Sequence, residues 1–165
     1  MTQNLQAQRA TEYQVKAAFI LNFSKFVEWP GDAFARQSDI FILGVLGKDP
    51  FGDYLDEIVE GEKIEGKKLI IQRYNSVDDI HDCQILFINV PEETGAVIKR
   101  LKGRSILTVS DDADFSRAGG IIQFYKQDDA IRLQINPDAA KEANLTLSSK
   151  LLRIAKIDES DIPDE

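Results

Sequence analysis

The stretch that decides the fold is Ser105–Lys156, which reads SILTVSDDADFSRAGGIIQFYKQDDAIRLQINPDAAKEANLTLSSKLLRIAK. It begins with an apolar run, Ile106–Val109, that is typical of a buried strand. Two further apolar runs, Ile121–Tyr125 and Ile131–Ile135, are joined by four polar residues, Lys126–Asp129. Two apolar runs with a short polar connection predict a β-hairpin. The stretch therefore predicts one strand and then a hairpin at an edge of the sheet.

The remainder of this stretch predicts helices. Asn136-Pro137 is typical of a helix start, because asparagine caps the first turn and proline needs no amide partner there. Asn144 tolerates a left-handed backbone, so the first of these helices should end near it. Ser148 predicts a new helix start, and we expect a closing helix over Ser149–Lys156.

Toward the N-terminus, we expect a disordered polar segment over residues 1–10 and an amphipathic helix from about Thr11. Trp29-Pro30 should end that helix, because the residue before a proline is pushed out of helical geometry. The apolar residues between these limits recur at three- and four-residue steps, which is the helical period. They are Val15, Ala18, Phe19, Phe23, Phe26 and Val27.

Between the two ends, apolar strands alternate with helices. Ile40–Leu46, a strand within Gly66–Tyr74, and Ile85–Val90 are the expected strands, and Phe51–Val59 and Glu92–Leu101 the expected helices. This alternation predicts an α/β fold: a three-layer α/β/α sandwich of Rossmann or flavodoxin-like type, with a mainly parallel sheet and an antiparallel edge hairpin. The expected strand order is 2-1-3-4-hairpin. Residues 11–157 should form one domain, followed by an acidic disordered tail over 158–165.

The composition excludes several classes of function. The chain has 165 residues, 43% hydrophobic and 29% charged, with a formal net charge of −8. Such a charge disfavours nucleic-acid and anionic-membrane partners. No apolar run approaches the roughly 18 residues of a membrane span. One cysteine cannot form an intramolecular disulfide and one histidine cannot build a typical zinc site, so we expect neither a metal nor a cofactor.

A ligand pocket, if the chain has one, should lie beyond the carboxyl ends of the parallel strands, where the strand order reverses. The glycine-rich turn after the first strand either binds an anion or simply makes a tight turn, since it matches no phosphate-binding motif. Lys48 is the cation in this group and would meet an anionic ligand. The candidate pocket residues are Gly47, Lys48, Asp49, Asn89, Ser110 and Asp111.

No catalytic constellation emerges from the sequence. Ser110-Asp111-Asp112-Ala113-Asp114 is either a cation site or the cap of a short helix, and the cap is favoured because the ligand spacing of a calcium loop is missing. The aspartates that a phosphoacceptor receiver domain needs at its strand ends are also missing. His81 has no nucleophile motif to activate, and Cys83 precedes a buried strand, as inert cysteines do. We therefore assign no catalytic residue.

Several segments together resemble one family. Lys16–Pro30, KAAFILNFSKFVEWP, is similar to the opening helix of the YfiR-like family, which ends in Glu-Trp-Pro. The resemblance extends from about Tyr13 to Ile157. Its other segments are Ile42–Gly52, Gly66–Lys68, Cys83–Ile88, Ile106–Asp111, Gly119–Phe124, Ile135-Asn136 and Leu147–Ala155.

The resemblance implies an exported, periplasmic regulatory protein without catalytic activity, whose signal peptide is removed from the sequence given. It implies repression of a membrane-bound diguanylate cyclase through binding to the cyclase's periplasmic portion, which lowers cyclic-di-GMP and biofilm formation. A small-molecule or nucleotide-binding α/β domain, enzymatic or not, is the alternative. Because the first and last helices are too apolar for one buried stripe, we expect a partner or a homodimer to contact them. The residues expected at this surface are Phe19, Phe23, Phe26, Leu151 and Leu152.

Overall fold

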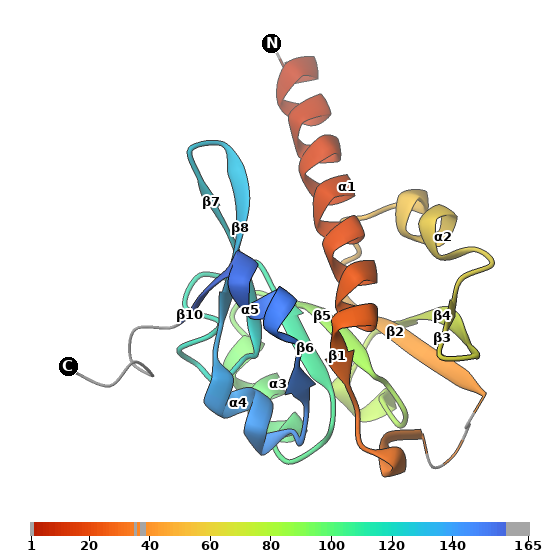
Figure 1. Ribbon diagram of the computed structural model, residues 1–165. Coiled ribbons are helices and arrows are strands. Elements are labelled where there is room, and N and C mark those ends of the chain that lie inside the picture. The colour runs from red at the N-terminus through yellow and green to blue at the C-terminus, as the bar shows by residue number, and fades with distance from the viewer. Residues whose placement is uncertain (1, 35, 37–38, 158–165) are drawn as a thin grey trace.

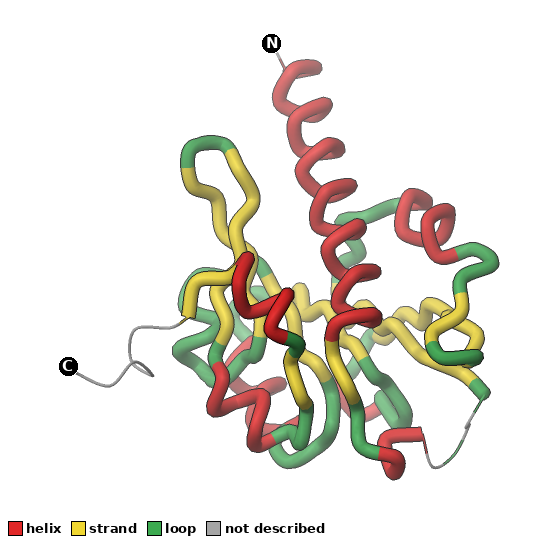
Figure 2. The backbone as a smooth tube through the Cα atoms, in the orientation of Figure 1, coloured by secondary structure: helices red, strands yellow, loops and turns green. Residues whose placement is uncertain are grey.

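The computed structural model describes residues 2–34, 36 and 39–157, and its centre is an eight-stranded sheet (Figures 1 and 2). β4, β2, β5, β6 and β7 run parallel, whereas β3 and β8 are antiparallel to their neighbours β4 and β7. The strand order confirms the expected 2-1-3-4-hairpin arrangement. From one edge to the other the strands are β10 (Ala155–Ile157), β8 (Ala130–Ile135), β7 (Ile122–Gln127), β6 (Leu107–Ser110), β5 (Ile85–Asn89), β2 (Ile40–Gly47), β4 (Lys67–Tyr74) and β3 (Lys63–Ile64).

Helices cover both faces of this sheet, which confirms the α/β class. Along β2, Leu43 and Val45 pack in one hydrophobic cluster with α1, whereas Ile42 and Leu46 pack in a second cluster with α3. Because successive side chains of a strand point to opposite faces, a strand that is apolar throughout must be buried on both. The helices are α1 (Thr2–Phe26), α2 (Asp53–Val59), α3 (Thr94–Leu101), α4 (Pro137–Glu142) and α5 (Ser149–Ile154), with 3-10 turns at Gly31–Phe34 and Val77–Asp79.

The first helix begins much earlier than its expected start at Thr11. α1 is already helical at Thr2, so the expectation of a disordered segment over residues 1–10 is wrong. Glutamine, alanine, leucine and arginine are good helix formers, and no glycine or proline interrupts them, so the polar composition did not imply disorder. The core residues that α1 contributes among the described residues, Ala17, Ile20 and Phe23, lie in its C-terminal half. The N-terminal turns extend beyond the sheet (Figure 1).

The expected hairpin is present, although β10 pairs outside it at the sheet edge, and its turn has two residues rather than the expected four. β7 extends to Gln127 and β8 begins at Ala130, so the turn is Asp128-Asp129. Both aspartates have positive φ, 53° and 62°. Two consecutive left-handed residues give a turn whose twist matches that of the strands, and aspartate tolerates this conformation better than most residues.

The closing segment follows the predicted capping. The Asn136 side chain accepts a hydrogen bond from the Ala139 amide, Asn144 has a φ of 59°, and the Ser148 hydroxyl accepts from the Leu151 amide. The expectation of helix up to Lys156 is wrong, however. α5 ends at Ile154, and β10 pairs with β8 instead. A further antiparallel strand pair, β1 (Val27–Glu28) with β9 (Thr146–Leu147), joins the segment that follows α1 to the segment that precedes α5. The expected acidic tail, 158–165, lies outside the described residues.

Gln84 links the end of α1 to the sheet. Its side chain, 1% exposed, accepts a hydrogen bond from the Ile42 amide at 2.6 Å and donates one to the Ala33 carbonyl at 2.9 Å. The main-chain carbonyl of Gln84 accepts a hydrogen bond from the Trp29 indole N–H at 3.0 Å, and the Trp29 ring meets the Phe41 ring edge to face. Buried amides must be paired, so this arrangement fixes where the chain leaves α1.

Replacing Trp29 by alanine should therefore lower the free energy of unfolding by about 2–3 kcal/mol, because a half-buried ring and a hydrogen bond are both lost. Trp29→Phe keeps the ring contact and should cost about 1 kcal/mol. Urea unfolding measures both changes. It should be followed by far-ultraviolet circular dichroism, because Trp29 is the single tryptophan and both variants lack its fluorescence. A loss below about 1 kcal/mol for the alanine variant would show that Trp29 does not anchor α1.

Candidate functional site

Three of the expected pocket residues meet where β2 and β5 end. Gly47 has a φ of 90°, and a Cβ atom there would lie 2.1 Å from the Asn89 carbonyl oxygen, so only glycine fits. The Asn89 side-chain amide donates to the Lys48 carbonyl at 2.8 Å, and the Lys48 amide donates to the Asn89 carbonyl at 3.3 Å. The glycine turn thus holds the two strand ends together and leaves the Lys48 side chain exposed.

The other three expected residues are committed to contacts within the protein. The buried Ser110 hydroxyl donates to the Ile88 carbonyl at 2.8 Å and accepts from the Asp112 amide at 3.1 Å. This contact closes a turn, and residues 113–119 form turns rather than a helix, so the expected helix cap is wrong. Asp49 accepts from the Phe51 amide and the Arg73 side chain, both at 2.7 Å, and so is turned toward β4. Asp111 accepts its hydrogen bonds from α1.

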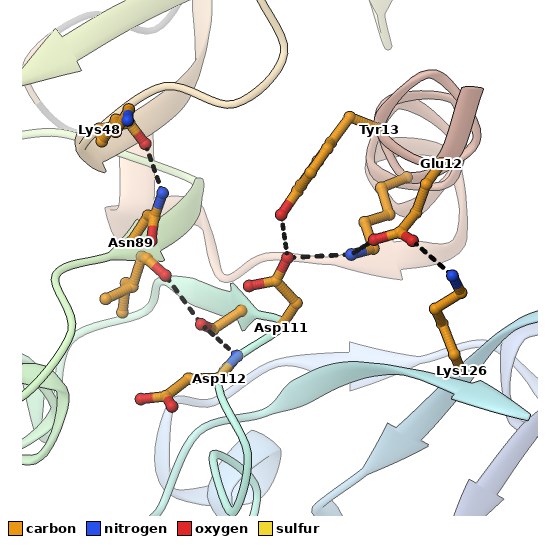
Figure 3. Close-up of polar contacts among 10 residues, drawn as sticks. Glu12, Tyr13, Lys48, Asn89, Asp111, Asp112 and Lys126 are labelled. Carbon is orange, nitrogen blue, oxygen red and sulfur yellow. Dashed lines mark hydrogen bonds and ion pairs between the residues drawn. The ribbon is translucent and has the colours of Figure 1, made fainter. Parts of the chain in front are cut away.

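A buried lysine on α1 is the feature that the sequence reasoning missed. Lys16 is 3% exposed, and its ammonium lies 2.9 Å from an Asp111 carboxylate oxygen and 2.8 Å from one of Glu12. The Tyr13 hydroxyl donates to the same Asp111 oxygen at 2.8 Å, and Lys126 on β7 pairs with Glu12 at 3.1 Å (Figure 3). These five residues, which we call the Lys16 network, connect α1 to the loop after β6 and to the hairpin.

The charges of the Lys16 network are balanced within it. Burial raises the pKa of Tyr13, and the neighbouring Asp111 carboxylate raises it further, so the phenol stays protonated and donates. Burial opposes ionisation of Glu12, but hydrogen bonds from Lys16 and Lys126 outweigh it and lower the pKa of Glu12. A lowered pKa means that Glu12 stabilises the fold fully above its ordinary pKa of 4.5 and that this contribution is lost as the pH falls through the lower folded value.

The sequence carried one signal for this network. Glu12 and Lys16 are four residues apart, the spacing of a helical ion pair, and Lys16 falls on the same face as Ile20 and Phe23. A lysine on the buried face of a helix predicts a partner carboxylate across the interface. The sequence offered no means of choosing Asp111 among the chain's carboxylates, because the choice depends on where α1 crosses the sheet.

A cavity of about 900 Å³ lies beside the network, between the N-terminal turns of α1 and the ends of β2 and β5. Of the expected pocket residues, the described lining includes Lys48 and Asn89 only, joined by residues that the sequence reasoning did not select. The described lining carries three cations, Arg9, Lys48 and Lys126, and one carboxylate, Glu12. The remaining lining residues are Leu5, Gln6, Gln8, Ala10, Tyr13 and Pro50.

The expected partner surface is only partly accessible. Phe23 and Leu151 are fully buried, so their assignment to an exposed surface is wrong; they pack in the core. Phe19 and Phe26 are partly buried against the same cluster. On α5, Leu152 is 36% exposed and Ile154, which was not selected, is 57% exposed. Leu152 and Ile154, which we call the α5 apolar pair, are the accessible apolar residues near the expected surface.

The two reactive side chains considered in the sequence analysis, Cys83 and His81, lie in different surroundings. Cys83 is buried, and burial raises the pKa of its thiol to about 12, which makes it a poor nucleophile. His81 is exposed in the loop before β5. Among the described residues, no group of histidine, cysteine and acidic side chains is arranged to hold a metal ion. The described helices include none with the length and apolar character needed to cross a bilayer.

These features define an α/β sandwich whose polar network serves to fix a helix. A family model described as YfiR/HmsC-like matches residues 13–156, so the chain belongs to the YfiR/HmsC-like family. Membership implies a regulatory role in cyclic-di-GMP signalling rather than an enzymatic one. A comparison with curated proteins finds no match.

Replacing Lys16 by methionine should lower the free energy of unfolding by about 2–3 kcal/mol, because it leaves Asp111 and Glu12 without their shared cation. Lys25→Met, on the exposed part of the same helix, is the matched control and should change stability by less than about 0.5 kcal/mol. Urea unfolding at neutral pH measures both. Equal, small effects of the two changes would contradict the role given to the buried ion pairs.

Proposed function

We propose that this protein is a periplasmic regulatory binding protein. It represses a membrane-bound diguanylate cyclase by binding the periplasmic portion of that enzyme, and so lowers cyclic-di-GMP and biofilm formation. The observation that carries the proposal is the YfiR/HmsC-like match over residues 13–156, which spans all or part of every helix and nearly all of the sheet.

A regulator without chemistry of its own acts by binding one state of its partner more tightly than another. Such an interface is anchored by a few apolar side chains that are exposed in the free protein. The α5 apolar pair meets this requirement, and α5 itself is fixed: Leu151 is fully buried, and the Ser148 amide donates to the Phe26 carbonyl at 2.9 Å. We therefore place the partner contact on α5, next to the end of α1. The same surface would serve a homodimer, so dimerisation and partner binding would compete.

A small-molecule-binding function is the second candidate, and the cavity at the ends of β2 and β5 favours it. The two functions are compatible, since a ligand there would act through α1 on the surface that α1 shares with α5. They are separable by experiment because the cavity residues and the α5 apolar pair are different residues.

Changing Leu152 or Ile154 to aspartate should weaken binding to the purified periplasmic portion of the cognate cyclase by about 30-fold, since an interface anchor is worth about 2 kcal/mol. Lys150→Gln, an exposed position on the same helix, should leave the affinity within about twofold. Calorimetry on the full chain measures the affinities.

Dithiothreitol should have no effect on this binding, because the single cysteine is buried. Unchanged binding in both aspartate variants would show that the contact lies elsewhere, and loss of binding on reduction would point to a disulfide between chains through Cys83.

A further inference from the structure

The N-terminal half of α1 presents a polar face to the body of the protein. Farther along α1, in its C-terminal half, the same side of the helix carries Ile20 and Phe23, which are fully buried. One to three turns earlier it carries Lys16, Tyr13, Glu12 and Arg9, and the last three line the cavity. A polar face opposite a polar cavity cannot close by hydrophobic contact, because its charged groups would lose their hydration. The space therefore remains open to water or to a polar ligand.

The charges around the cavity are of one predominant sign. Three cations against one carboxylate give the described lining a formal charge of +2, within a chain whose net charge is −8. The carboxylate, Glu12, is already paired with Lys16 and Lys126. The Arg9 and Lys48 side chains have no ion-pair or hydrogen-bond partner among the described residues. Two unpaired cations that line the same concave site attract anions more strongly than the same charges on a convex surface.

We propose that this cavity is a binding site for a small multivalent anion carrying phosphate or carboxylate groups, held between Arg9 on α1 and Lys48 after β2, with Lys126 on the hairpin as a third contact. The cations come from three elements, so only a ligand with at least two anionic groups would bridge them. The side-chain amide of Asn89 has two N–H groups. One donates to the Lys48 carbonyl, which leaves the other for the ligand.

Binding would also change the state of α1. An isolated helix of about ten residues is marginal in water, and residues 5–10 of α1 contribute no side chain to the described hydrophobic core. An anion that links Arg9 to Lys48 would tie these turns to the sheet. This site stands independently of the proposed cyclase regulation, since an anion could bind here whichever partner the protein has.

The test is titration of the full chain with pyrophosphate and with citrate by calorimetry, at ionic strength matched with sodium chloride. Arg9→Gln, Lys48→Gln and Lys126→Gln each remove one cation from the lining. Lys141→Gln removes an exposed cation from α4 and is the matched control. Each cavity change should weaken binding of at least one of the two anions by about tenfold, since a charged hydrogen bond is worth that much. The control should stay within about twofold.

Nuclear magnetic resonance of the labelled protein provides a second readout, with the Arg9, Lys48 and Asn89 amides expected to shift on titration. Lys126→Gln also breaks the pair with Glu12, so Arg9→Gln and Lys48→Gln decide the outcome if that variant is poorly folded. No saturable binding of either anion would overturn the proposal. Binding that all four changes weaken equally would overturn it too, because it would report net charge rather than a site.

Discussion

The structure depends on a buried ammonium that has to be paired. Lys16 sits 3% exposed among aromatic rings, with its charge 4.4 Å from the Tyr13 ring centroid. A buried charge is tolerated only with partners close by, and two carboxylates supply them, Glu12 from the same helix and Asp111 from the loop after β6. Since Asp111 is fixed at the end of a buried strand, the pair sets the depth and rotation of α1. The stacking of Phe23 on Phe124 then follows from that placement.

Different contacts hold the chain at the amino ends and at the carboxyl ends of the parallel strands. At the amino end, the Trp29 indole and the Gln84 side chain lock the chain through hydrogen bonds that are largely out of water. At the carboxyl end, the contacts to α1 include the ion pairs of the Lys16 network, which lie beside the cavity. A regulator needs one part that holds its shape and one that responds, and ion pairs beside water respond more readily to ligands and salt than a buried amide network does.

The sequence predicted the central sheet because long apolar strands bounded by glycine and proline leave few alternatives. It also predicted the caps at Asn136 and Ser148, which depend on local chemistry alone. It failed where the outcome depends on distant contacts. β10 replaces the last turn of the expected helix because the β8 edge is available, and Phe23 is covered because Phe124 lies opposite it. The cavity beside the Lys16 network includes Lys48 and Asn89 from the expected pocket residues, but Arg9 and Lys126 were missed because α1 and the hairpin extend farther than their patterns indicated.

Amide hydrogen exchange along α1 tests most directly whether the Lys16 network is what fixes this helix. We expect strong protection from about Lys16 to Phe26, and weak protection before Glu12, with the change falling within the one turn that carries the buried pairs. In Lys16→Met the boundary should move toward Phe23, because the aromatic contacts then hold the helix alone. Uniform protection from Thr2 to Phe26, or a boundary that stays in place in Lys16→Met, would contradict the role given to the Lys16 network.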